Sequence, residues 1–170
     1  MENIKEKTCA FTGHRPERLG FGYNEKSQSC VAFKVRLRRI LQELIENEGF
    51  TYFLSGGAMG MDMYAAEAVL DLKARYPHIC LEMVIPCPQQ ADRWSPAMRL
   101  RYNNILARCD KKTVLSPVYY DGVMQVRNRY LVDHAGLLLA AYDGKNRGGT
   151  AMTVHYAQKT GVRVRNEMAE

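Results

Sequence analysis

The stretch TYFLSGGAMGMD, residues Thr51–Asp62, decides the fold. Its first four residues are β-branched, aromatic or aliphatic, which indicates a buried strand over 51–54. Ser-Gly-Gly breaks the strand, and apolar residues at helical spacing then predict a helix over 61–76. A strand, a glycine-rich turn and a helix in this order form the repeating unit of proteins built on a parallel sheet.

The same alternation continues on both sides of this stretch. Further strands are expected at 8–12, 79–85, 112–115, 136–141 and, at one edge, 162–164. Further helices are expected at 25–47, 96–109, 122–134 and 150–159. Residues 1–170 are therefore predicted to form a single α/β domain, a three-layer Rossmann-like fold with a mostly parallel central sheet flanked by helices.

Composition excludes several classes of protein. The chain is 46% hydrophobic and 25% charged, as is typical of globular proteins. It has no apolar run near the roughly 20 residues that span a bilayer, and its charged N-terminus does not resemble a signal peptide. A cytoplasmic location without membrane association is therefore expected. The five cysteines are scattered and never spaced as C-x-x-C, which argues against a disulfide framework and a metal site.

The net charge of +6 is compatible with more than one role. A basic balance suits an anionic ligand or a weak nucleic-acid contact. It suits a solvated basic helix equally well, so charge alone does not distinguish these readings.

The turn at 55–62 is the strongest functional signal. Glycines let backbone amides approach a ligand without an intervening Cβ, and the helix that follows directs its positive dipole end to the same place. Together they predict a phosphate site. Asp62 can cap this helix or hold a ribose hydroxyl. The alternative to phosphate binding is that the glycines of this turn serve close packing alone. The candidate ligand-binding residues here are Ser55, Gly56, Gly57, Ala58, Gly60 and Asp62.

A second turn, Thr12-Gly13-His14-Arg15, follows the first strand. Arg15 can grip a phosphate through two parallel hydrogen bonds, and Thr12 and Gly13 are expected to contact the ligand with it. His14 can donate to a ligand oxygen, act in acid–base chemistry, or simply hydrogen-bond to the backbone. These three roles stay open for His14.

A third turn follows the strand at 136–141, where glycines again open a helix. Its candidate ligand contacts are Asp143, Gly148, Gly149 and Thr150, and its alternative role is that of a surface loop. Because ligands of such sheets bind beyond the carboxyl ends of the strands, we expect all three turns to form one pocket.

Two further segments carry residues of interest. On the helix at 122–134, Arg127 and Tyr130 share a face, while Asn128 and Arg129 point elsewhere. One of the two arginines can therefore enter the pocket while the other stays solvated. Trp94 can act as a stacking platform for a base or serve as packing.

Taken together, these motifs resemble the YpsA-like proteins of the SLOG superfamily, whose other branches include the DNA-processing protein DprA and the cytokinin-activating LOG proteins. The resemblance rests on TGHRP at 12–16, SGGAMGMD at 55–62, IPC at 85–87, RNRY at 127–130, and YDG with GGT at 142–150. It implies a Rossmann-like fold and a nucleotide-derived ligand such as ADP-ribose or NAD, with no cofactor required.

The resemblance also shows a departure. LOG enzymes cleave the N-glycosidic bond of nucleoside monophosphates with a helix arginine, which Arg127 resembles, and a glutamate, whose place is taken here by Thr153. A threonine hydroxyl cannot carry negative charge beside an oxocarbenium ion or act as a base near neutral pH, which argues against an enzyme of this mechanism. Glu67 and Asp143 are the candidates to replace that glutamate, so the catalytic candidates are Arg127, Glu67 and Asp143.

Three hypotheses follow from the sequence. The first is a sensor or regulatory protein that binds an ADP-ribose-like, NAD-like or nucleoside phosphate ligand and passes the bound state to a protein partner. The second is a LOG-like nucleotide phosphoribohydrolase. The third is DprA-like binding of single-stranded nucleic acid, against which the lack of aromatic–basic alternation argues. Apolar helix faces leave pairing of two copies open.

Overall fold

Six parallel strands form one sheet in the order β4-β3-β2-β1-β5-β6. The structure is a computed structural model that describes residues 4–167. The strands are β1 (Thr8–Gly13), β2 (Tyr52–Ser55), β3 (Cys80–Ile85), β4 (Lys111–Val114), β5 (Leu137–Ala141) and β6 (Arg163–Asn166). The predicted α/β fold is confirmed, and the sheet is parallel throughout rather than mostly so.

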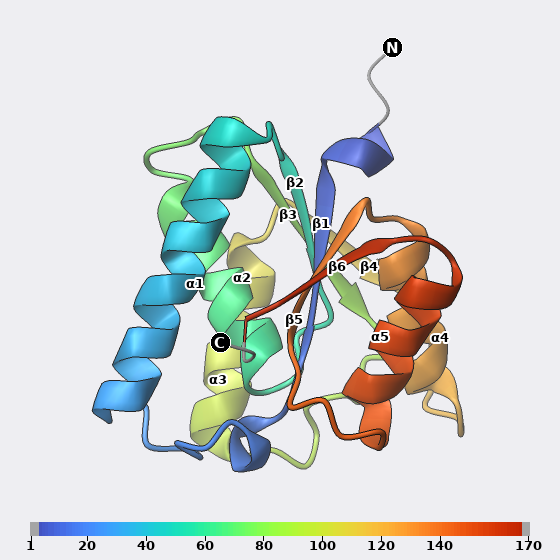
Figure 1. Cartoon of the computed structure of the whole chain (residues 1–170). Helices are drawn as coiled ribbons and strands as arrows, with labels where there is room; N and C mark the ends of the chain where they lie inside the picture. Colours follow the sequence, from blue (N-terminus) through green and yellow to red (C-terminus); the bar gives the residue numbers. More distant parts are fainter. Residues whose placement is uncertain (1–3, 168–170) are drawn as a thin grey trace.

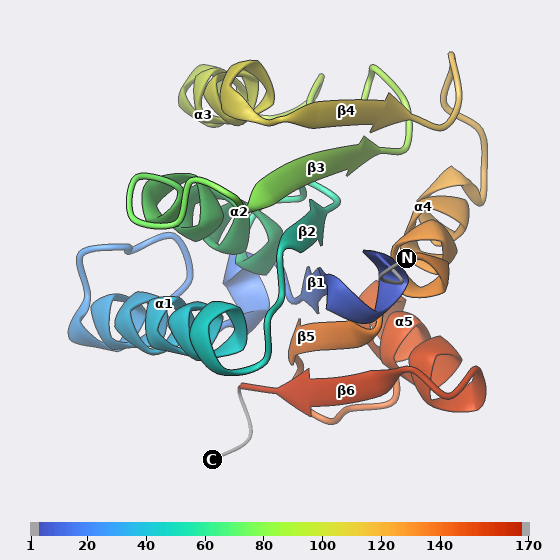
Figure 2. The same cartoon turned by 90° about the horizontal axis from the view of Figure 1, so that it is seen from above.

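Five α-helices flank the described part of the sheet in two layers. One face carries α1 (Gln28–Asn47), α2 (Met61–Leu72) and α3 (Pro96–Arg108), and the other carries α4 (Val123–Asp133) and α5 (Gly148–Lys159) (Figures 1 and 2). Two short 3₁₀ helices, η1 (Ile4–Lys7) and η2 (Pro16–Arg18), flank β1. Within residues 4–167, no helix is both long and apolar enough to cross a bilayer.

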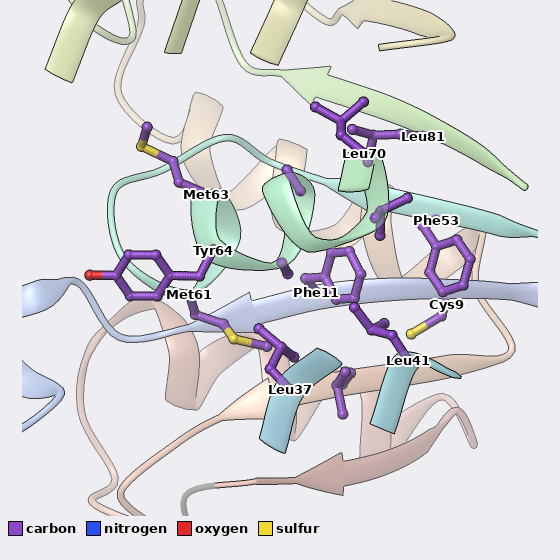
Figure 3. Packing of buried hydrophobic residues seen from close by; sticks show 14 of the residues in the cluster. Cys9, Phe11, Leu37, Leu41, Phe53, Met61, Met63, Tyr64, Leu70 and Leu81 are labelled. Atoms are coloured by element: carbon purple, nitrogen blue, oxygen red, sulfur yellow. The ribbon is translucent and has the colours of Figure 1, made fainter. Parts of the chain in front are cut away.

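Side chains alternate between the two faces of the sheet, as a strand requires. Phe11 and Phe53 point toward α1 and α2, where their rings stack with centroids 6.1 Å apart (Figure 3). Their neighbours Ala10 and Leu54 point to the opposite face and pack in the cluster that contains residues of α4 and α5. Both faces of the central strands are therefore buried, which explains their nearly continuous apolar sequences.

Three helix boundaries differ by two residues or more from those expected from the sequence. The first helix begins at Gln28 rather than residue 25, because the Ser27 hydroxyl caps it by accepting from the Cys30 amide at 3.2 Å. The second ends at Leu72, whose carbonyl accepts turn hydrogen bonds from the amides of Arg75 and Tyr76. The last begins at Gly148 instead of residue 150.

The strand order reverses between β1 and β5. The chain leaves β1 toward the layer that contains α1 and leaves β5 toward the layer that contains α5 (Figure 2). The two connections diverge at this point and leave a crevice at the carboxyl ends of these strands, where open α/β sheets bind their ligands.

Candidate functional site

A pocket of about 330 Å³ lies at this crevice, a volume within the range of small-molecule sites. It is bounded by the turn after β1, the start of α2, one side of α4 and the first turn of α5. The predicted meeting of the three glycine-marked turns is thus present in the structure. The lining residues are Thr12, Gly13, His14, Arg15, Glu17, Arg18, Ala58, Asp62, Met124, Arg127, Asn128, Gly149 and Thr150.

Arg127 of α4 is the central cation of the pocket and is only 5% exposed. Its Nη1 donates to the carbonyl oxygen of Gly56 at 2.6 Å and to Oε1 of Gln90 at 3.1 Å, and its Nε donates to Oδ1 of Asn128 at 2.9 Å. Its Nη2 contacts the Met124 sulfur at 4.0 Å. Among residues 4–167, no carboxylate forms an ion pair with this guanidinium, and burial lowers its pKa.

The helix N-termini of α2 and α5 add partial positive charge to the pocket. In the described chain, neither is capped by a side chain: the cap residues are Gly60 for α2 and Arg147 for α5. Gly149 and Thr150 of α5 line the pocket, and within residues 4–167 the Thr150 hydroxyl has no hydrogen-bond partner. Amide and hydroxyl donors are therefore available to an anion at this wall.

Asp62 is a buried carboxylate in the same pocket, with 6% of its surface exposed. Its Oδ2 accepts from the amide of Ala58 at 3.3 Å, so it braces the turn that precedes α2. Burial raises the pKa of this carboxyl group to about 6, against the opposing influence of the Arg127 charge. The carboxyl group of Asp62 is therefore protonated more easily than that of an exposed aspartate.

His14 joins the turns after β1 and β5. It is 2% exposed, and its Nε2 accepts a hydrogen bond from the Asp143 amide at 3.0 Å. Burial and the charge of Arg18 lower the pKa of His14, which is consistent with a neutral ring accepting this bond. Of the three roles open from the sequence, the structure shows the backbone hydrogen bond. Nε2 also lies 3.1 Å from Oδ1 of Asp143, and the residue borders the pocket, so contact with a ligand stays a prediction.

Asp143 holds the same junction from the other side. Its carboxylate accepts from the Lys145 amide at 2.9 Å and from Arg18 Nη2 at 2.8 Å, and these donors lower its pKa. Arg18 lines the pocket, whereas Asp143 is outside the set of described lining residues. Asp143 thus orients a pocket arginine.

Several of the candidate ligand-binding residues lie outside the pocket lining and support the residues that form it. Ser55 is fully buried; its hydroxyl donates to the Asp62 carbonyl at 2.9 Å and accepts from the Gly57 amide at 3.2 Å. Gly57 faces Met83 and Tyr102 with a φ of +75°. Among the described residues, the candidates outside the lining are Ser55, Gly56, Gly57, Gly60, Asp143 and Gly148.

At Gly60, the turn that precedes α2 packs closely against the backbone of the turn that follows β1. Its φ is +92°, and a Cβ there would lie 2.5 Å from the carbonyl oxygen of His14. A glycine is therefore required for this backbone approach. Gly13 plays a similar part, because a Cβ on it would overlap the Met61 side chain.

Comparison with known proteins identifies the family. The YpsA model, described as the YspA SLOG family, matches residues 9–168. The chain belongs to this family. It is 33% identical to a UPF0398 protein of Halalkalibacterium halodurans over 156 residues, which cover 90% of this chain and 81% of the relative. A UPF0398 protein of Brevibacillus brevis is 29% identical over 155 residues, with the same coverage of both chains.

Two solved structures share the fold of this YpsA-family chain. DNA processing protein A (DprA) of Streptococcus pneumoniae superposes with a TM-score of 0.61 at 18% identity, over 95% of this chain and 50% of that one. The Helicobacter pylori DprA structure, titled for its single-stranded DNA binding mode, gives 0.61 at 20% identity, over 96% of this chain and 67% of the other. At these identities the likeness establishes the fold.

In this SLOG domain the candidates for a replacement glutamate lie apart from Arg127. Glu67, on α2, accepts from Arg101 Nε at 2.9 Å and lines a separate hollow between α1, α2 and α3. Thr153 is 2% exposed and its hydroxyl donates to the Gly149 carbonyl at 2.7 Å, within α5. Of the three catalytic candidates, only Arg127 belongs to the described lining of the pocket.

The sequence missed four lining residues of the YpsA-family pocket: Glu17, Arg18, Met124 and Asn128. The prediction that Asn128 points away from the pocket is wrong, because its side chain accepts from Arg127. Arg18 pairs with a residue 125 positions away, for which one sequence carries no signal. The sequence offers one indication of this role, because Arg18 is a basic residue that closely follows the second turn.

Two other predictions concern residues outside the pocket. Trp94 packs edge-on against Tyr102 with ring centroids 5.2 Å apart, so the packing reading holds. All five cysteines, each within the described chain, are free. Residues 4–167 contain no cluster of three or more His, Cys, Asp or Glu side chains suited to a metal ion.

Proposed function

We propose that this SLOG protein binds a nucleotide-derived small molecule, with its phosphate groups in the pocket between β1 and β5. ADP-ribose, NAD and nucleoside phosphates are the ligand classes considered. The bound state is passed to a protein partner, so the protein acts as a sensor or regulator.

The buried Arg127 guanidinium carries this proposal. A charge removed from water is costly unless it is paired, and among the described residues no carboxylate lies within ion-pair distance of it. Arg127, the uncapped start of α5 and the exposed Arg15 all border one cavity. A phosphate there would supply the missing negative charge. Several charge-assisted hydrogen bonds of about 1.5–3 kcal/mol each support micromolar affinity.

Titration calorimetry with ADP-ribose, NAD and AMP tests the proposal, with adenosine as the ligand that lacks phosphate. Binding is expected for the phosphate-bearing ligands and to be lost or weakened about 10–100-fold in Arg127→Met. Arg129→Met is the matched control, because Arg129 is exposed on the same helix and stacks on Tyr156. Equal binding of adenosine and AMP, or full affinity in Arg127→Met, would refute the assignment.

A nucleotide phosphoribohydrolase is the second candidate, because the buried carboxyl group of Asp62 shares the pocket with Arg127. Against it stands Thr153, whose hydroxyl is engaged inside α5. Incubation with AMP and chromatographic detection of free adenine separates the two functions. Adenine release that Arg127→Met abolishes would favour the enzyme over the sensor.

Single-stranded DNA is the third ligand class, suggested by the fold shared with DprA. A gel shift with a labelled oligonucleotide at two salt concentrations tests it, since phosphate contacts make binding steeply salt-dependent. We expect no such complex at physiological salt, because the basic groups described above gather at one pocket of about 330 Å³.

A further inference from the structure

Asp62 and Arg127 are two buried side chains of opposite charge that line the same pocket. Both are less than 7% exposed and both line the pocket, yet the two described side chains are not within the 4.0 Å that defines an ion pair. The two residues therefore border the same pocket without an ion pair between them. An anion that occupies this space meets Arg127 and Asp62 at the same time.

The groups around Asp62 come from the turn that precedes α2 and from three other segments. On α4, Arg127 supplies the opposing charge, and in the turn after β1, Arg15 supplies a second one. The Ala58 amide donates directly to Oδ2. His14, Glu17 and Arg18 border the same pocket, and Thr150 faces it from α5.

An anion in the pocket shifts the equilibrium between the protonated and the ionised carboxyl group of Asp62. In the empty pocket, burial already favours the neutral carboxyl, and the charges of Arg127 and Arg15 oppose it. A bound phosphate partly neutralises the positive charge of these arginines, so they stabilise the ionised Asp62 less. It also adds negative charge beside the carboxylate. Both effects favour the protonated form, since two neighbouring anions in a buried site do not both stay ionised.

We propose that Asp62 takes up a proton from solvent when a phosphate-bearing ligand binds, and that its carboxyl hydrogen is then donated to a ligand oxygen. This inference rests on the proposed function and deepens it by assigning a determinant of specificity. A protonated Asp62 selects an acceptor oxygen, such as that of a phosphate. An ionised Asp62 would instead select a hydroxyl donor, such as that of a ribose.

Calorimetry of ADP-ribose binding in buffers of different ionisation enthalpy measures the proton. ADP-ribose is the probe because its pyrophosphate does not titrate near neutral pH, so any proton taken up is bound by the protein. At about pH 8, where Asp62 is ionised in the free protein, wild type should take up close to one proton. The dissociation constant should increase by up to about tenfold per pH unit above about pH 7.

Two variants assign the proton to a residue. Asp62→Asn keeps an oxygen that accepts from the Ala58 amide, and it should bind ADP-ribose with no proton uptake and no pH dependence between about pH 7 and 8. Asp71→Asn makes the same change at an exposed position of α2 and should behave as wild type.

The possible results have distinct meanings. Uptake that persists in Asp62→Asn would assign the proton to another group, such as His14, and would overturn the inference. Binding by wild type without proton uptake and without pH dependence would overturn it as well, while leaving the proposed function intact. Absence of binding at every pH would refute the proposed function itself. Should Asp62→Asn fail to fold, Asp62→Ser, which also cannot ionise near neutral pH, makes the same assignment by the same measurement.

Discussion

The guanidinium of Arg127 lies directly against Gly56 and donates to the carbonyl oxygen of that glycine at 2.6 Å. A Cβ on residue 56 would lie 2.5 Å from Nη1 of Arg127. Gly56 therefore makes room for a side chain of the protein, rather than for the ligand that the glycine-rich turn first suggests.

Gly56→Ala should weaken ligand binding although residue 56 is outside the described lining of the pocket. The added methyl group displaces Arg127, and we expect the affinity for ADP-ribose to fall about tenfold or more. The double variant Gly56→Ala/Arg127→Met should bind no worse than Arg127→Met alone, because the two changes act on one interaction. Additive losses in calorimetry would show that Gly56 acts independently of the arginine.

Thr150 and Thr153 lie one turn apart on α5 and allow a matched comparison. The Thr150 hydroxyl borders the pocket, whereas that of Thr153 donates to the Gly149 carbonyl at 2.7 Å. Thr150→Val should reduce ligand affinity about 3–10-fold, the effect of one hydrogen bond. Thr153→Val should leave affinity unchanged and alter only the melting temperature. Equal affinity losses in the two variants would contradict this placement of the hydroxyls.

Gly57 and Gly149 should differ in their effect on stability. Gly57 has a φ of +75°, and a Cβ there would lie 3.0 Å from Met83 Cε and Tyr102 Cε2. Gly57→Ala should lower the free energy of unfolding by about 1–3 kcal/mol. A Cβ at Gly149 meets only Asn128, at an ordinary 3.8 Å, so Gly149→Ala should change stability by less than about 0.5 kcal/mol. Urea unfolding monitored by circular dichroism measures both.

Asp62→Asn should stabilise the empty protein at neutral pH. The pKa of Asp62 is raised on folding from 3.8 to about 6, so its stabilising neutral form is lost as pH rises through this window. Ionisation then costs the native state about 3 kcal/mol at neutral pH. The variant cannot ionise, so its advantage over wild type in urea unfolding should grow between about pH 4 and about pH 7.

The difference in stability between Asp62→Asn and wild type removes the contributions of the other groups that titrate in this pH range. His14 has a lowered pKa and therefore contributes in the opposite direction, with stability lost as pH falls below its usual range. It is present in both proteins. A difference in stability that stays constant with pH would show that Asp62 does not ionise in the folded protein.

The fold was predictable because its signals are local. The run TYFL and the glycines of the turn at 55–62 identify a strand that passes into a helix, and this pattern repeats along the chain. The crevice at the carboxyl ends of the strands then follows from the parallel topology. Helical spacing separates the faces of Arg127 and Arg129 and predicted that one of them enters the pocket, and the resemblance to the LOG arginine pointed to Arg127.

The inner arrangement of the pocket was not predictable, because it depends on contacts between distant segments. Ser55 looks like a ligand-binding hydroxyl in the sequence, but in the structure its partners are Asp62 and Gly57. Glu67 follows the turn at 55–62 closely, yet the rotation of the helix places it beside Arg101, away from the pocket. Only three-dimensional packing determines which face of the turn meets the cavity.

The junction made by His14, Arg18 and Asp143 has a consequence for association kinetics. It ties together the turns after β1 and β5, so the walls of the cavity stand in place before a ligand enters. The proposed ligand is then expected to enter without a preceding rearrangement, at a rate set by encounter and by electrostatic steering from the basic lining. Added salt should slow the capture of a phosphate-bearing ligand far more than its escape.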